Sequence, residues 1–211
     1  MELRCHEIQK ALLEIHTAIM DLKGKKIILA SGSPRRRELL GAMGIEFTVD
    51  TGNTFEEVYS PDTPHDQIPV LMAEGKSHGF HRELTSDEIL ITSDTMVLCD
   101  GQVMGKPKDR EDAIRMISFL CGKAHEVITA VTIRDCKKSV TFSDKTIVRF
   151  RNLSLPEIEY YVDNYKPFDK AGAYAIQEWI GHVGISGVEG SMNTVIGFPT
   201  HRVYEELLKF I

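Results

Sequence analysis

The chain has 211 residues, of which 42% are hydrophobic and 27% are charged, a balance typical of a globular protein with a substantial core. Its net charge of −6 argues against nucleic acid or an anionic membrane as a partner, so any anion site must be a local patch. The four cysteines are widely spaced and form no C-x-x-C pair, which predicts reduced thiols. No apolar run approaches the roughly 18 residues of a membrane span and no signal-peptide core is present, so we expect a cytoplasmic protein.

Residues 1–24 predict an amphipathic helical extension. Leu12, Ile15, Ile19 and Leu22 recur at spacings of three and four, and Gly24 can end the helix. We expect this apolar stripe to pack on the domain or on a second subunit. We expect residues 25–211 to form the main domain.

The next segment predicts an anion site. Residues 27–30 are typical of a buried strand, and a Ser-Gly turn leads from it into a helix. Ser33 suits the N-cap, Pro34 suits the first helical position, and Gly44 can end the helix. The arginine run at 35–37 then lies in the first turn, where each cation costs about 0.3–1 kcal/mol unless an anion docks there. A phosphate cradle and a solvated basic turn both agree with this pattern.

Carboxylates follow in two places. Residues 46–51 predict a second strand, and Glu56 and Glu57 lie in the loop after it as oxygen ligands for Mg²⁺ or as solvated acids. Residues 66–83 predict a helix that carries Lys76, and residues 89–93 predict a buried strand. Asp94 would then lie at or near the C-terminal end of that strand, where open α/β sheets present functional groups. It could activate water, hold a divalent cation or simply form a turn.

The middle of the chain predicts a hairpin, a helix and a β-ribbon. Asp100-Gly101 predicts a hairpin turn. Lys106 follows within Gly-Lys-Pro, which places its positive charge near that hairpin. Asp109 suits the N-cap of a helix that continues to residue 120. Residues 125–134 and 140–151 predict two long strands, and His125 at the start of the first is expected to be a core or edge residue.

The last third begins with a capping box at residues 154–157, which predicts a helix to about residue 164. A run of small residues at 169–177 lets the backbone approach a ligand closely, and it contains Lys170 as a candidate phosphate ligand. Gln177 could read a base edge or be an ordinary surface residue. Residues 183–188 predict a strand, a glycine-bracketed loop reaches residue 197, and residues 200–210 predict a helix. Alternating helices and strands predict an α/β fold with a mixed sheet.

Several segments spread over residues 26–210 resemble the motifs of one family in their order. They are Leu29-Ala30-Ser31-Gly32-Ser33-Pro34-Arg35-Arg36, Ser93-Asp94-Thr95-Met96-Val97, Gly105-Lys106-Pro107, His125-Glu126-Val127-Ile128-Thr129, Asp169-Lys170-Ala171-Gly172-Ala173-Tyr174 with Ile176-Gln177, and Glu189-Gly190-Ser191 with Val195-Ile196-Gly197-Phe198-Pro199. The family is that of the Maf nucleoside-triphosphate pyrophosphatases. The resemblance implies an elongated mixed β-sheet flanked by helices, with two lobes around a deep cleft as in Maf and inosine-triphosphatase proteins, and often a homodimer.

The resemblance also implies an activity and its residues. The activity is hydrolysis of a nucleoside triphosphate to the monophosphate and pyrophosphate with Mg²⁺ or Mn²⁺, as a housecleaning reaction. Asp94 matches the general base and Glu57 the second acidic group, and both are the expected metal ligands. The expected phosphate ligands are Ser33, Arg35, Arg36, Lys76 and Lys106, of which Lys106 also assists catalysis. Arg35, Thr95 and Gln177 match the positions that mark the dTTP/UTP branch.

Two alternatives stay open at this point. One is another Maf branch, which uses 7-methyl-GTP or mixed pyrimidine nucleotides. The other is a non-catalytic nucleotide-binding regulator of septum formation. The chain also departs from the family pattern, because residues 1–24 are extra, Glu178-Trp179 follows Gln177 where glycine is usual, and Met192 stands where an aromatic residue is common.

Overall fold

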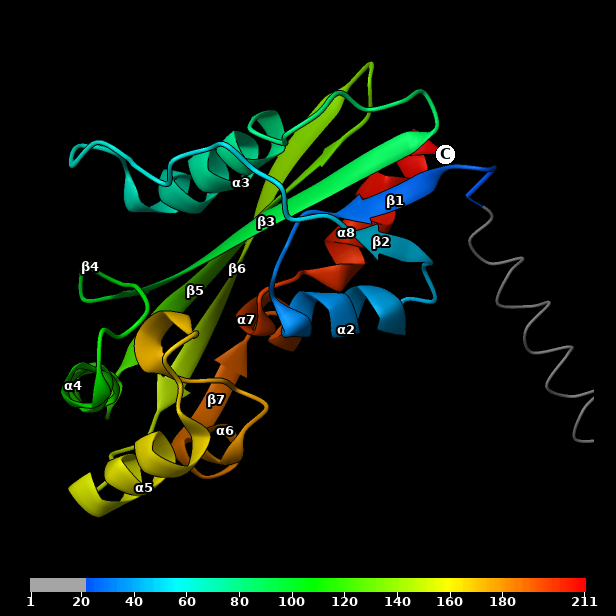
Figure 1. The fold of residues 1–211 in the computed structure, drawn as a ribbon. Coiled ribbons are helices and arrows are strands. Elements are labelled where there is room, and N and C mark those ends of the chain that lie inside the picture. The colour runs from blue at the N-terminus through cyan, green and yellow to red at the C-terminus, as the bar shows by residue number, and fades with distance from the viewer. Residues whose placement is uncertain (1–21) are drawn as a thin grey trace, which may run out of the picture.

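The structure is a computed structural model that describes residues 22–211. Residues 1–21 of the extension expected over 1–24 lie outside these residues, and residues 22–24 form no helix. Within them, a seven-stranded mixed sheet forms the centre of the molecule (Figure 1). The α/β class and the mixed sheet flanked by helices are therefore confirmed.

The strand order along the sheet is β2-β1-β3-β5-β6-β7, and β4 pairs with the far end of β3. β1 runs parallel to both of its neighbours, and the other pairs are antiparallel. The strands are β1 (Lys26–Leu29), β2 (Phe47–Val49), β3 (Glu88–Cys99), β4 (Gln102–Met104), β5 (Ala124–Arg134), β6 (Ser139–Phe150) and β7 (Ile185–Glu189).

Helices cover both ends of the long strands. At the β1 end, α3 lies on one side of the sheet and α2, α7 and α8 lie on the other, whereas α4, α5 and α6 gather at the opposite end (Figure 1). The helices are α2 (Pro34–Ala42), α3 (Ile68–His78), α4 (Arg110–Leu120), α5 (Leu155–Tyr165), α6 (Trp179–Gly184), α7 (Met192–Ile196) and α8 (Thr200–Leu207), with single 3-10 turns at His65–Gln67, Ala171–Ala173 and Leu208–Phe210. None of the helices between residues 22 and 211 has the length and apolarity that crossing a membrane requires.

Each end of the sheet has its own core. Ile91 of β3 packs with Leu40 and Val203 in the cluster at the β1 end. Val97 of the same strand packs with Ile117 and Tyr161 in the cluster at the other end. β3 therefore runs through both cores, and its middle residues lie between them.

The local signals at helix and hairpin ends are confirmed. The Ser33 hydroxyl accepts a hydrogen bond from the Arg36 amide at 3.4 Å, and the Asp109 carboxylate accepts one from the Asp112 amide at 2.8 Å. The capping box at residues 154–157 is complete, and the Asp100-Gly101 turn has both φ angles positive, as a tight hairpin requires. These interactions involve near neighbours in the chain, which is why the sequence predicts them well.

Four predicted elements were wrong in extent. The helix expected over 66–83 ends at His78, because Phe80 pairs with Asn53 instead of continuing the helix. The strand expected over 183–188 begins only at Ile185, since the preceding residues form α6. The loop expected between residues 190 and 197 contains α7, and the final helix gives way to a 3-10 turn after Leu207.

Gly181 gives a test of this packing. A methyl group at Gly181 in α6 would lie 1.7 Å from the backbone oxygen of Ile176, whereas at Gly41 in α2 it would lie 3.9 Å from the Phe47 ring. We expect Gly181→Ala to lower the free energy of unfolding by about 1–3 kcal/mol. The matched Gly41→Ala should raise it by up to about 1 kcal/mol through helix propensity. Urea unfolding measures both, and equal effects would contradict the close approach of α6 to residue 176.

Candidate active site

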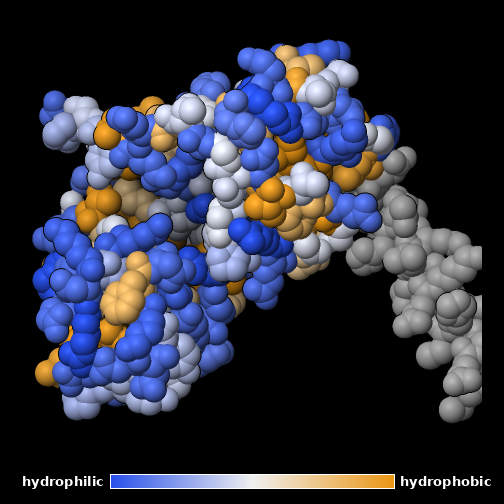
Figure 2. Space-filling model, viewed as in Figure 1, coloured by the Kyte–Doolittle hydropathy of each residue, from blue (hydrophilic) through white to orange (hydrophobic). Residues whose placement is uncertain are grey.

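A cavity of about 760 Å³ opens at the middle of β3, and Figure 2 shows a hollow there between the two ends of the molecule. Its walls come from the β1–α2 turn, the loop from 51 to 59, α3, β3, the segment after β4 and the segment from 169 to 177. The site residues that the family resemblance implies all line it: Ser33, Arg35, Arg36, Glu57, Lys76, Asp94, Thr95, Lys106 and Gln177. Glu56, the other candidate carboxylate of its loop, does not. The structure thus brings together groups that are far apart in the chain.

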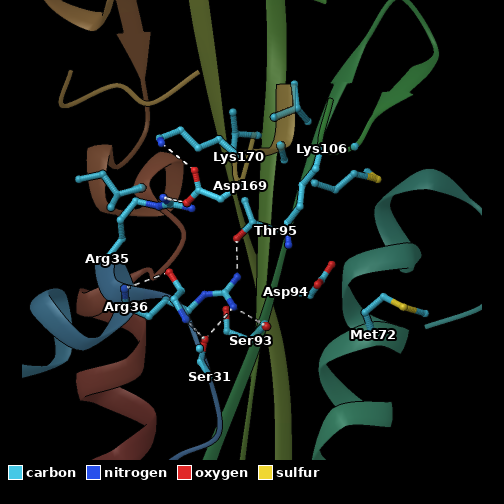
Figure 3. A pocket seen from close by; sticks show the side chains of 18 of the residues that line it. Ser31, Arg35, Arg36, Met72, Ser93, Asp94, Thr95, Lys106, Asp169 and Lys170 are labelled. Carbon is cyan, nitrogen blue, oxygen red and sulfur yellow. Dashed lines mark hydrogen bonds and ion pairs between the residues drawn. The ribbon is translucent and has the colours of Figure 1, made fainter. Parts of the chain in front are cut away.

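The cavity forms where one edge of β3 has no neighbouring strand. β1 pairs with residues 88–91 of β3, and β4 begins to pair on the same edge only at Val97. Within the described part of the chain, no strand covers residues 92–96 on this edge. Because side chains of a strand alternate between faces, Asp94 and Thr95 point to opposite sides, yet both reach the cavity around the open edge (Figure 3).

The expectation that Asp94 lies at or near the end of a strand was wrong. β3 continues through Cys99, and Asp94 pairs with Ala130 in the middle of the β3–β5 ladder. The polar run 93–95 resembles a strand end, but β5 satisfies its backbone on one side. Asp94 is accessible because the opposite edge is open.

Arg36 provides hydrogen-bond donors for backbone oxygens at and beside this open edge. Its guanidinium donates to the backbone oxygen of Ser93 at 2.9 Å and to the oxygen of Gly197 at 2.9 Å. It also donates to the Ser31 hydroxyl at 3.3 Å and the Thr95 hydroxyl at 3.0 Å. Burial lowers the pKa of Arg36 to about 10, so the group stays protonated at neutral pH. Most of its N–H groups are thus bound to protein, which makes Arg36 an anchor of the cavity wall.

The hydrogen bonds around Thr95 determine what its hydroxyl can do. The Thr129 hydroxyl donates its only proton to the backbone oxygen of Thr194 at 2.8 Å. The 3.0 Å contact between Thr95 and Thr129 must therefore use the Thr95 proton. Since the Thr95 oxygen already accepts from Arg36, it can offer a ligand only its remaining lone pair. Thr95 faces the cavity as an acceptor.

The acidic residues converge on one cation. Lys76 Nζ on α3 lies 2.7 Å from Asp94 Oδ1 and 3.1 Å from Glu57 Oε1. The carboxylates thus share a point that suits positive charge. In the described residues, no cluster of three or more His, Cys, Asp or Glu side chains could hold a metal by itself. Two carboxylates completed by water and substrate phosphates are the coordination that Mg²⁺ prefers, so the donors fit that ion.

The opposite wall carries a second group of charges. Arg35 Nη1 lies 2.7 Å from Asp169 Oδ2, and Lys170 Nζ lies 2.8 Å from the other oxygen of Asp169 (Figure 3). Lys106 lies exposed nearby, and a 3.0 Å hydrogen bond from the Gly172 amide to the Gly105 oxygen fastens its loop to the same segment. Gln177 is exposed at the cavity. The wall therefore carries cations that come from three separate parts of the chain.

Sequence reasoning missed Asp169 as a functional candidate and left Lys170 out of the final set. Their position inside a run of small residues was the available signal. His125 was correctly expected in the core: its Nε2 lies 2.7 Å from the Tyr174 hydroxyl, and burial lowers its pKa to about 4. Its Nδ1 is a buried side-chain atom that has no hydrogen-bond partner among residues 22–211.

Comparison with known proteins agrees with this arrangement. The sequence profile of the family described as Maf-like protein matches residues 26–210. A dTTP/UTP pyrophosphatase of Phocaeicola vulgatus is 46% identical over 189 residues, which are 90% of this chain and 98% of that protein. Proteins of the same name from Parabacteroides distasonis and Christiangramia forsetii are 44% and 46% identical over 190 residues, or 90% of this chain and 98% and 96% of theirs. The chain belongs to the Maf-like protein family.

Proposed function

We propose that this protein hydrolyses nucleoside triphosphates, dTTP and UTP foremost, to the monophosphate and pyrophosphate. The observation that carries the proposal is that one cavity brings Asp94 face to face with Lys76 and gathers the positive charge of Arg35, Lys106 and the first turn of α2. The names of the relatives support the same reaction and substrates. They do not favour a 7-methyl-GTP enzyme or a non-catalytic regulator.

The triphosphate would lie with its phosphates against the α2 turn and the lysines. The N-terminal amides of α2 and the cations Arg35, Lys76 and Lys106 neutralise the phosphate oxygens as charge moves toward the leaving group. The first turn of α2 contains no acidic residue that would oppose this charge. The two ends of the sheet would thereby act as lobes around one cleft.

Asp94 would act as the general base. Its Oδ1 accepts from Lys76, which leaves Oδ2 to take a proton from a water molecule. The water oxygen forms a bond to the α-phosphorus while the bond from that phosphorus to the bridging oxygen breaks, and pyrophosphate leaves with the electron pair. A divalent cation held by Glu57 and Asp94 would supply further positive charge against the phosphates.

Thr95 supports a preference for thymine and uracil. Its hydroxyl can only accept a hydrogen bond from a ligand, because its own proton is donated to Thr129. The N3 position of thymine and uracil carries a hydrogen that can be donated, whereas N3 of cytosine is an acceptor. A base read at Thr95 would therefore be bound in the first case and rejected in the second.

Asp94→Asn tests the chemical step. The amide cannot accept the proton, so kcat should fall about 10²–10⁴-fold while binding of a non-hydrolysable dTTP analogue persists. Pyrophosphate release and calorimetric titration measure the two quantities. Asp163→Asn is the matched control, because Asp163 pairs with Arg110 outside the cavity. A variant at position 94 with unchanged kcat would remove Asp94 from the mechanism.

Glu57→Gln tests the cation site. Loss of one carboxylate should raise the Mg²⁺ concentration for half-maximal activity by about 10-fold. The adjacent Glu56→Gln should leave that concentration unchanged, since Glu56 is not among the residues that line the cavity. Mn²⁺ titration followed by electron paramagnetic resonance gives the affinity directly. Equal affinities in the two variants would contradict a role for Glu57 in cation binding.

Thr95→Val tests base recognition. The ratio of kcat/KM for UTP over CTP should be at least about 10 in the unaltered protein and should fall toward 1 in the variant. Thr51→Val, at an exposed threonine of the same cavity, should retain the ratio. A ratio that survives Thr95→Val would show that the base is read elsewhere.

A further inference from the structure

Asp169 stands between two cations in the wall of the cavity. Its Oδ2 contacts Arg35 at 2.7 Å and its Oδ1 contacts Lys170 at 2.8 Å (Figure 3). Arg35 belongs to α2 at one end of the sheet, whereas Asp169 follows α5 at the other end and lies 134 residues later in the chain. The carboxylate therefore links elements from the two ends of the sheet through a side-chain contact within this wall.

The Asp169 side of this link is firmly held. The Lys170 side chain is only 10% exposed and also lies 3.4 Å from Glu178 Oε1. Glu178 accepts a hydrogen bond from the buried Tyr161 hydroxyl, and that hydroxyl in turn accepts one from the Ala175 amide at 3.1 Å. Such a chain of bonds fixes Lys170, and through it one oxygen of Asp169, against the α5 core.

Asp169 is ionised at neutral pH. Partial burial would raise the pKa of its carboxyl, but hydrogen bonds from Lys170 and Arg35 outweigh this effect and lower it to about 2. The link to Arg35 is thus a charged one at neutral pH. It persists on a side chain that is 55% exposed, so solvent weakens but does not remove it.

Arg35 has donors to spare. Its guanidinium makes one hydrogen bond among the described residues, from Nη1 to Asp169, whereas the guanidinium of Arg36 makes four to protein groups. Because a guanidinium is planar, an ion pair at one nitrogen restricts the directions in which its remaining N–H groups can meet another acceptor. Its side chain is 21% exposed and lines the cavity, so those groups face the space where a triphosphate would lie.

We propose that Asp169 is a positioning residue for substrate binding, because its carboxylate, braced by Lys170, holds the Arg35 guanidinium with its free N–H groups toward the triphosphate. This inference rests on the proposed function. It assigns Asp169 to binding, not to proton transfer. A carboxylate that merely competed with the substrate for Arg35 would weaken substrate binding, whereas a carboxylate that positions Arg35 strengthens it.

The test is the kinetics of Asp169→Asn with dTTP. The nearly isosteric amide removes the charge, so KM should rise about 10-fold while kcat stays within about twofold. Asp169→Glu, which retains the charge, should recover most of the lost affinity. In an Arg35→Ala background the Asp169→Asn substitution should change KM no further, because the residue acts through Arg35. Asp163→Asn, which breaks an exposed ion pair between Asp163 of α5 and Arg110 of α4, is the control for a general loss of charge.

Two results would overturn the proposal. An unchanged or lower KM in Asp169→Asn would make Asp169 a bystander or a competitor of the substrate. Multiplicative effects of the Arg35 and Asp169 substitutions would show that the two residues act separately. The same cycle measured by calorimetry with a non-hydrolysable dTTP analogue separates this inference from the proposed reaction. If the unaltered protein binds the analogue but releases no pyrophosphate from dTTP, the proposed reaction is contradicted. The binding cycle would still show whether Arg35 and Asp169 act together.

Discussion

The open edge of β3 is the constraint on which the site depends. β1 ends at Leu29 and β4 pairs only from Val97, so a stretch of β3 lies between them with one side of its backbone unpaired by any strand in residues 22–211. An unpaired edge exposes polar backbone groups that need partners. Arg36 is such a partner, because it donates a hydrogen bond to the Ser93 oxygen. The cavity occupies the space beside this edge that no strand fills. The gap in the sheet thus gives side chains from both faces of β3 access to one cavity.

The charges around the gap follow a common arrangement. The chain as a whole is acidic, yet the cavity gathers Arg35, Lys76, Lys106 and Lys170. Carboxylates hold three of these cations: Asp94 and Glu57 face Lys76, and Asp169 joins Arg35 to Lys170. These ion pairs offset the repulsion between neighbouring cations when no polyanion is bound. A triphosphate would then meet oriented cations instead of mobile ones, which is the electrostatic preorganisation that catalysis requires.

The sequence predicted the parts of the fold that depend on near neighbours. Ser33 and Asp109 cap their helices as expected, because each bonds to an amide three residues away. Motif order also predicted the residues that line the cavity. The features that could not be predicted depend on contacts with distant residues. Asp94 lies in the middle of a strand because β5 continues to pair with β3 beyond it. Whether the Thr95 hydroxyl donates or accepts depends on its contact with Thr129. No local pattern encodes where β1 stops relative to β3.

Hydrolysis of dTTP in ¹⁸O-enriched water tests the central claim most directly, since it shows which phosphorus receives the water oxygen. A cavity in which Asp94 directs water onto the α-phosphorus predicts one ¹⁸O atom in the thymidine monophosphate and none in the pyrophosphate. Label in the pyrophosphate, or release of single phosphate groups, would place the attack on another phosphorus and contradict the account.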